Sequence, residues 1–367
     1  MDFRIDKATF AAALKGAASV ADAKSTMPVV ANALLRVVDG KLLVAATDLN
    51  LSTITTLPLA GATPGGLTVK AKALHDIVSG MPGTEVALRK VENNWAEIKA
   101  GKVSYRIVGM PDRDFPKVPD DRDAAYVTVD AGALRGMLAA TVHSICNDEK
   151  RFHLNGVLVE SDGKTVRMVS TDGHRLAKAD RKLKGPKLAA GVIVPKKGVL
   201  ELRKLLDGAK EVELAIRSPF LFVKRAESML AVKLIDAQFP PYGQVIPKDH
   251  ATRAVVSRED LLGALRRCQL MASETRGVKF EFADTSVSIS SDNPDVGEVQ
   301  EEVECQTTGP GVVIGVNGKY LIDLANVLKD VDEGAIAIEL GGALDPLLVR
   351  SVADPDAFVG VVMPMRI

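Results

Sequence analysis

Residues 157–177 read VLVESDGKTVRMVSTDGHRLA, and this stretch decides the fold. Two strand-like runs flank the polar pair Asp162-Gly163, which is the pattern of antiparallel strands joined by a tight turn. The second run ends in STDGHRLA, where a hydroxyl, a carboxylate, an imidazole and a guanidinium lie within six positions, as in a catalytic or metal-binding motif. An active site is normally built once, whereas a structural turn is reused, so recurrence of the stretch decides between the two interpretations.

The hairpin occurs three times in the chain. Residues 34–52, LLRVVDGKLLVAATDLNLS, and residues 279–297, KFEFADTSVSISSDNPDVG, align with the middle copy. Their aspartates, Asp48, Asp172 and Asp292, are separated by 124 and 120 residues. We therefore expect an aspartate that accepts backbone N–H bonds in a turn of each copy. The pair His174 and Arg175 is found in the middle copy alone, so a function was added to one repeat.

Two helices keep the same register in every copy. Segments 3–14, 127–138 and 254–265 each predict a strand, an Asp or Ser N-cap and an apolar helical stripe. Segments 69–78, 194–203 and 316–325 each predict a second helix after the hairpin, followed by further alternating strands. The sequence thus predicts an α+β fold of three repeated domains, at residues 1–124, 125–250 and 251–367.

Composition narrows the class of protein. Of 367 residues, 47% are hydrophobic and 26% are charged, as in soluble globular proteins. The charged N-terminal residues and the absence of a long apolar run predict a cytoplasmic protein with no signal peptide and no membrane span. Cys146, Cys268 and Cys305 lie far apart without CxxC spacing, and the five histidines form no HxxxH or HxH pair, so we expect reduced thiols, no metal and no cofactor.

Charge is unevenly distributed although the chain is neutral overall, with 47 basic and 47 acidic residues. The predicted helices lie within stretches whose formal charges sum to +7, which leaves −7 on the rest of the chain; these stretches are residues 6–16, 70–76, 130–143, 194–210, 257–267 and 317–329. One interpretation is that basic side chains simply decorate solvated helix faces. The other is a shared cationic surface, which attracts phosphates without reading base sequence.

Four motifs, STDGHRLA, LNGVLVE, FPPYGQVIP and the terminal VVMPMRI, resemble the bacterial DNA polymerase III beta subunit, the sliding clamp family. The resemblance covers all three repeats. It implies a head-to-tail homodimeric ring around duplex DNA, with helices lining the hole and antiparallel sheets outside. Helices about 10 Å across give a hole of roughly 28 Å for twelve helices and only about 9 Å for six, so a dimer is the smallest ring that fits a duplex.

The resemblance also implies a function without catalysis. The ring keeps a tethered polymerase at the primer end as a processivity factor. The expected partners are duplex DNA, a second copy of the chain, the alpha subunit of the replicative polymerase, the clamp loader, and other polymerases and repair proteins that carry short hydrophobic peptide motifs. No membrane partner is expected.

Site residues carried over from the family fall into three sets. The peptide groove is expected at Leu154, Thr171, Gly173, His174, Arg175, Leu176, Pro240, Val245, Val362, Met363, Pro364, Met365 and Arg366. DNA contacts are expected at Lys24, Lys196, Lys197, Arg203, Arg266 and Arg267. The dimer seam is expected to bring Tyr105 and Ile107 against Leu270 and Met271.

Two departures and two alternatives accompany this interpretation. Gln244 stands where the family often has Arg, and Asp148 with Glu149 places acidic charge near the expected DNA face. One alternative is an enzyme that uses Asp172 and His174 as acid and base or as metal ligands on phosphate substrates. The other is a monomeric repeat scaffold that binds proteins but not DNA.

Overall fold

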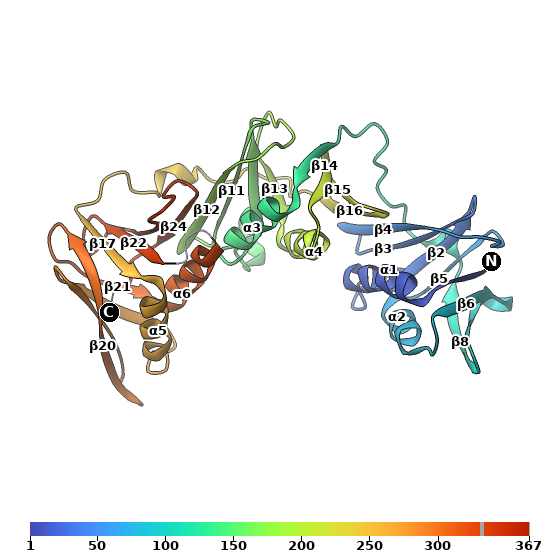
Figure 1. The fold of residues 1–367 in the computed structure, drawn as a ribbon, viewed down its shortest axis with the longest axis horizontal. Coiled ribbons are helices and arrows are strands. Elements are labelled where there is room, and N and C mark those ends of the chain that lie inside the picture. The colour runs from blue at the N-terminus through green and yellow to red at the C-terminus, as the bar shows by residue number, and fades with distance from the viewer. Residues whose placement is uncertain (331–333, 367) are drawn as a thin grey trace. The chain divides into compact units, whose positions relative to one another are not determined.

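The computed structural model describes residues 1–330 and 334–366, and both predicted helices form in each repeat (Figure 1). They are α1 (Lys7–Val20), α2 (Ala71–Gly80), α3 (Ala131–Val142), α4 (Lys196–Leu206), α5 (Arg258–Cys268) and α6 (Gly318–Val327). The expected caps are present at α1, where Asp6 accepts from the Thr9 amide at 2.8 Å, and at α5, where Ser257 accepts from the Asp260 amide. Apolar residues such as Phe10 and Leu14 in α1 are fully buried against the sheets.

Eight strands accompany the two helices of each repeat in the part of the chain that the structure describes. The first repeat has β1 (Asp2–Asp6), β2 (Asn32–Val38), β3 (Lys41–Thr47), β4 (Leu51–Pro58), β5 (Gly65–Lys70), β6 (Glu85–Lys90), β7 (Trp95–Ala100) and β8 (Val103–Met110). The second has β9 (Val127–Asp130), β10 (Gly156–Ser161), β11 (Thr165–Thr171), β12 (Arg175–Lys182), β13 (Val192–Pro195), β14 (Glu211–Arg217), β15 (Phe220–Arg225) and β16 (Ser228–Lys233). The third has β17 (Thr252–Ser257), β18 (Gly277–Phe282), β19 (Ser286–Asn293), β20 (Gly297–Thr308), β21 (Val313–Asn317), β22 (Ala335–Leu340), β23 (Leu347–Ser351) and β24 (Phe358–Val362).

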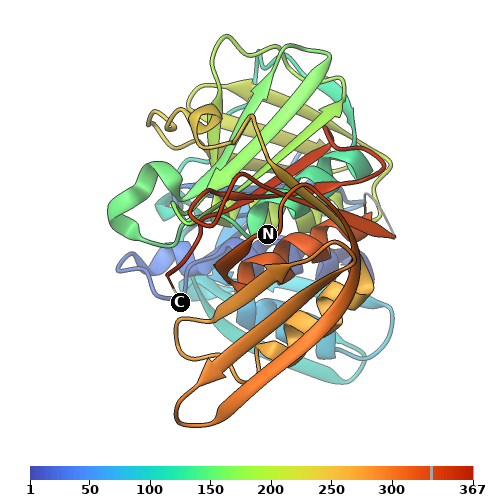
Figure 2. The same ribbon diagram turned by 90° about the vertical axis from the view of Figure 1, so that its left-hand side faces the viewer.

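The strands form two antiparallel sheets of twelve strands each. One sheet has the order β1-β6-β7-β8-β5-β2-β3-β4-β16-β15-β14-β9, and the other has the order β13-β10-β11-β12-β24-β23-β22-β17-β20-β19-β18-β21. Neighbouring repeats therefore join edge to edge, through β4 with β16 and through β12 with β24. Figure 2 shows the long β19–β20 hairpin of the second sheet in orange.

The contacts divide the chain into two compact units, Met1–Ala131 with Leu200–Leu234, and Gly132–Val199 with Ile235–Ile367. Each unit contains one of the two sheets. The middle repeat is divided between them because its strands β9, β14, β15 and β16 belong to the first sheet and its other four belong to the second. The boundaries at 124 and 250 stay a prediction.

The aspartate predicted to accept backbone N–H bonds in each turn does so in two of the three copies. Asp48 Oδ1 accepts from the amides of Asn50 and Leu51, and Asp172 forms the matching bonds in the middle copy. The expectation for Asp292 is wrong, because this residue lies within β19, opposite Glu298. The turn begins one residue later, where Asn293 Oδ1 accepts from the Asp295 amide at 3.0 Å.

Candidate functional site

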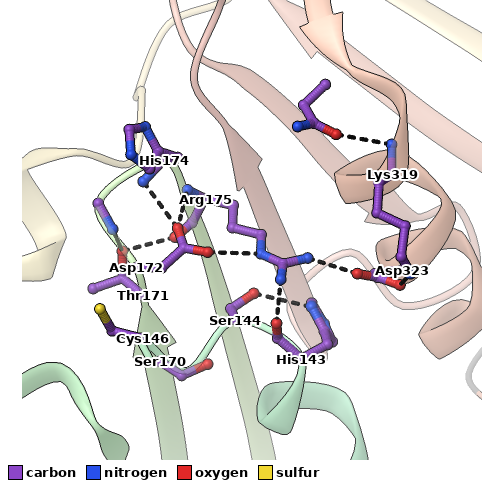
Figure 3. A network of polar contacts seen from close by, with 12 residues as sticks. His143, Ser144, Cys146, Ser170, Thr171, Asp172, His174, Arg175, Lys319 and Asp323 are labelled. Atoms are coloured by element: carbon purple, nitrogen blue, oxygen red, sulfur yellow. Dashed lines mark hydrogen bonds and ion pairs between the residues drawn. The ribbon is translucent and has the colours of Figure 1, made fainter. Parts of the chain in front are cut away.

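The turn after β11 is built by short-range hydrogen bonds (Figure 3). Asp172 Oδ1 accepts from the amides of His174 at 2.9 Å and Arg175 at 3.0 Å, while the Thr171 hydroxyl donates to the Arg175 carbonyl at 2.7 Å. Gly173 has a φ of 87°, in the left-handed region that glycine adopts without strain. This geometry exposes Gly173 and His174 at the tip of the turn, so their surface is available to a ligand.

Arg175 turns inward from this tip and connects three elements. Its Nε donates to Asp172 Oδ2 at 3.0 Å, one terminal nitrogen donates to Asp323 on α6 at 2.7 Å, and the other donates to the carbonyl of His143 after α3. The guanidinium also lies 4.4 Å from the centre of the Tyr320 ring. Only 12% of the side chain is exposed, so the expected groove residue Arg175 acts mainly inside the protein.

Burial and paired charges set the protonation of the residues around Arg175. Burial lowers the pKa of His143 to about 4, with a further contribution from the Arg175 charge, so this imidazole is neutral near pH 7. Burial alone raises the pKa of Asp323, but the hydrogen bonds from Lys319 and Arg175 outweigh it and hold the pKa below the ordinary value. The cluster therefore holds an ionised Asp323, paired with Arg175 and Lys319, beside a neutral histidine.

The C-terminal segment lies against the same turn. After β24, in which Val362 pairs with Arg175, the Met363 amide donates to the His174 carbonyl at 2.9 Å. Two residues later the Met365 amide donates to the carbonyl of Gly315 on β21 at 2.7 Å. These bonds fix Met363 beside His174 and Met365 beside β21, and the last residue of VVMPMRI, Ile367, lies outside the described residues.

The loop of residues 237–248 covers an apolar part of the second sheet. Phe239 packs into a buried cluster with Leu154, Leu176 and Val361. Its neighbour Tyr242 anchors the loop by donating to Glu160 at 2.6 Å. A hollow of about 1270 Å³ runs beside this loop and is lined by Pro240 and Gln244, whereas His174, Val245 and Met363 are not among its lining residues.

The expected groove residues differ in how much surface they offer. Leu154, Leu176 and Val362 are buried and can only support a groove from beneath. Thr171, Pro240, Pro364 and Met365 are partly exposed. The open apolar surface comes from Val245, which is 45% exposed, and Met363, which is 38% exposed, with Arg366 also open to solvent.

Comparison with known proteins identifies the family. Models of the DNA polymerase III beta subunit match the chain at residues 1–119 for the N-terminal domain, 128–241 for the central domain and 243–366 for the C-terminal domain. The beta sliding clamp of Vibrio cholerae is 32% identical over 370 residues, which cover 100% of both chains. This chain belongs to the sliding clamp family.

Solved clamps share the fold along the whole chain. The DNA polymerase III subunit beta of Pseudomonas aeruginosa matches with a TM-score of 0.94 at 31% identity, covering 100% of both chains. A Pseudomonas aeruginosa clamp solved with bound griselimycin matches with a TM-score of 0.93, also at 31% identity and covering 100% of both chains. The prediction of three repeated clamp domains is confirmed, and the family makes the chain a DNA polymerase processivity factor rather than an enzyme.

The expected DNA-contacting residues of this clamp differ in exposure and in the contacts that they make. Lys24, Lys197 and Arg266 are exposed. Lys196 donates to Asn147 at 2.7 Å, and the Arg203 side chain is half-buried. Arg267 forms a forked ion pair with Glu301 on β20, so part of its charge is already neutralised. Asp148 is explained as a cap that accepts from the Lys150 amide at 3.0 Å, while Glu149 remains exposed.

The expected seam residues lie on exposed surface of the clamp. Tyr105 is 46% exposed and Leu270 is 76% exposed, while Ile107 and Met271 are partly exposed. Tyr105 and Ile107 are on β8, whereas Leu270 and Met271 follow α5 in a turn rather than a strand. Tyr105 and Ile107 belong to one compact unit, and Leu270 and Met271 belong to the other.

Several residues of the site have no signal in the sequence. Asp323, Tyr320 and His143 surround Arg175, yet Asp323 is 148 residues away along the chain. Their helices are predictable, but the partner of each side chain is not. Residues 1–330 and 334–366 contain no group of three metal-ligating side chains and no helix long and apolar enough to span a membrane.

Proposed function

We propose that the surface between the His174 turn, the C-terminal segment and the loop of residues 237–248 is the groove through which this clamp holds its partners. The observation that carries the proposal is the hydrogen bond from the Met363 amide to the His174 carbonyl. It places an adaptable apolar side chain beside an exposed turn, and methionine accommodates anchors of differing shape. Short extended peptides with hydrophobic anchors fit such a surface.

The groove has a polar edge as well as apolar floor and walls. Gln244 lies in the short helix η5 (Tyr242–Gln244) and is exposed. An amide in place of the family's frequent Arg keeps hydrogen bonding but removes a charge from this edge. We therefore propose that this clamp relies less than other clamps on acidic residues flanking the peptide anchors.

A closed dimer is the second part of the proposal. The outer edge of Val103–Val108 in β8 and that of Gly297–Glu304 in β20 are unpaired within the described strand pairings. The β8 edge carries Arg106, while the β20 edge carries four glutamates, Glu298, Glu301, Glu302 and Glu304. Unpaired strand edges of complementary charge favour head-to-tail association, which closes into a ring when the rotation fits.

In this ring the helices face duplex DNA. Exposed Lys24, Lys197 and Arg266 then supply a diffuse positive field that neutralises phosphates without reading bases, which permits sliding. Lys196 and Arg203 contribute more weakly because their side chains are half-buried. The partners that we propose are the polymerase alpha subunit, the clamp loader, and other polymerases and repair proteins, all in the bacterial cytoplasm where the chromosome is copied.

Retention on DNA tests the ring. Protein placed by its clamp loader on a nicked circular plasmid should stay bound in high salt, because salt screens charge but does not open a closed ring. After linearisation it should slide off the ends. Equal loss from circular and linear DNA contradicts the ring, and a stable 39.0 kDa monomer at micromolar concentration favours the monomeric scaffold.

A further inference from the structure

The turn of the first repeat is a natural control for the turn that carries His174. Its Thr47 hydroxyl donates to the Leu51 carbonyl at 3.0 Å, as Thr171 does to Arg175 at 2.7 Å. The Lys233 amide donates to the Asn50 carbonyl at 2.7 Å, as Met363 does to His174. Leu51 occupies the position of Arg175, so this turn forms and pairs with its neighbouring strand without a guanidinium.

Arg175 therefore serves a purpose other than forming the turn. Its three bonded nitrogens reach Asp172, Asp323 and the His143 carbonyl, and its side chain is 12% exposed. A guanidinium held in three directions and stacked on Tyr320 is not available as the main ligand of a peptide. Among its hydrogen bonds, the one to Asp323 connects the turn to helix α6.

Asp323 is itself held in place from the other side. Lys319, one turn earlier on α6, forms an ion pair with Asp323 Oδ1, while Arg175 uses Oδ2 (Figure 3). Side-chain exposure is 17% for Asp323, so its pairs are poorly screened by solvent. Both carboxylate oxygens are used, and the turn is thereby connected to α6 by charge-assisted bonds.

We propose that Asp323 is a positioning residue of the peptide groove and acts through Arg175. Gly173 gives the turn more conformational freedom than Leu49 gives the corresponding turn of the first repeat, and the Arg175–Asp323 pair removes that freedom. It fixes His174, and with it the carbonyl that receives the Met363 amide. This inference rests on the proposed peptide groove.

Asp323→Asn tests the proposal, because it keeps the shape of the side chain and removes its charge. A fluorescein-labelled peptide copied from the clamp-binding segment of the polymerase should bind about tenfold more weakly, the loss typical of one charge-assisted hydrogen bond. Asp323→Glu keeps the carboxylate and should restore most of the affinity. Arg175→Lys should also weaken peptide binding, because one ammonium group cannot replace a guanidinium that bonds in three directions.

Local hydrogen exchange separates positioning from general stability. In Asp323→Asn, exchange of the His174 and Met363 amides should accelerate about tenfold, with no comparable change in strands β14 to β16 of the other compact unit. The matched control is Glu281→Gln, which removes an exposed ion pair with Lys279 and should leave both exchange and peptide affinity unchanged.

The outcomes are distinct. If Asp323→Asn binds the peptide as tightly as the unmodified clamp and its exchange is unchanged, Arg175 does not act through Asp323 and the inference is wrong. If the unmodified clamp fails to bind the peptide while exchange still accelerates in Asp323→Asn, the proposed groove is wrong and the positioning of the turn stands.

Discussion

At the scale of single residues, corresponding aspartates build the turn in two repeats. Asp48 accepts backbone amides of its own turn. Asp172 does so with one oxygen and uses the other to hold Arg175 at 3.0 Å. Where the first repeat has Leu51, the middle repeat has Arg175. The arginine connects the turn to neighbouring elements, while the hydrogen bonds of the turn itself are the same in both repeats.

The backbone of that turn predicts the effect of Gly173→Ala. The substitution forces alanine to a φ of 87° and brings its Cβ within 3.0 Å of Arg151, which donates to the Asp172 carbonyl. We expect a loss of about 1 kcal/mol in the free energy of unfolding and weaker peptide binding. Urea unfolding measures the first effect. The control, Gly136→Ala in α3, meets no atom within 4 Å and should stabilise the protein slightly.

His143 predicts a dependence of stability on pH. The unfolded chain binds a proton at this residue below its ordinary pKa of 6.5, whereas the folded protein does so only near 4, because burial and the Arg175 charge disfavour the imidazolium. Neutral His143 therefore contributes to the free energy of unfolding above pH 6.5, and this contribution is lost as the pH falls towards 4. The loss is about 2 kcal/mol between pH 7 and pH 5.

His143→Gln should remove this part of the pH dependence. Urea unfolding at pH 7 and pH 5 measures it, with His75→Gln on α2 as the control that keeps the difference. Asp323 and Lys319 face the same imidazole, and Asp323 remains ionised across this range because its pKa lies below the ordinary value. Equal pH dependence in the unmodified protein and in His143→Gln would place the responsible group elsewhere.

At the scale of elements, repetition made most of the fold predictable. All six helices and the three hairpins were expected from register shared between copies, because each copy confirms the others. Asp292 shows the limit, since alignment of letters did not reveal that the turn begins at Asn293. The ion pair between Arg175 and Asp323 could not be predicted from the sequence either. Periodicity indicates which face of an element is buried, but it does not indicate which side chains from distant elements meet.

The C-terminal segment provides the prediction at this scale. Deleting residues 363–367 removes two methionines and the backbone bonds to His174 and Gly315, while β24 keeps its pairing with β12 through Val362. Anchors in such pockets typically carry a few kcal/mol each, so the labelled polymerase peptide should bind at least about tenfold more weakly. Unchanged affinity in a protein that still dimerises would show that the groove is misplaced.

At the scale of the whole molecule, pairing of strand edges connects the repeats, and the unpaired stretches of β8 and β20 are the ones that we propose for association between chains. Within the chain, β4 with β16 and β12 with β24 join neighbouring repeats. The remaining edges of β8 and β20 differ in charge, and apolar Tyr105 lies on the first of them. A ring made of two chains reuses between chains the edge-to-edge pairing that already joins repeats within one chain.

Leu270→Asp tests that association. Leu270 is 76% exposed and is one of the residues expected in the seam. A carboxylate there should be buried without a partner in the dimer and should shift the protein towards the 39.0 kDa monomer. Light scattering at micromolar concentration measures the mass.

The control is Leu344→Asp. Leu344 is equally exposed at 76% but lies in the turn between β22 and β23, outside the proposed seam, so this variant should remain a dimer. If both variants keep the dimer mass, the seam does not involve Leu270; if both lose it, the two surfaces belong to one interface larger than the pairing of β8 with β20.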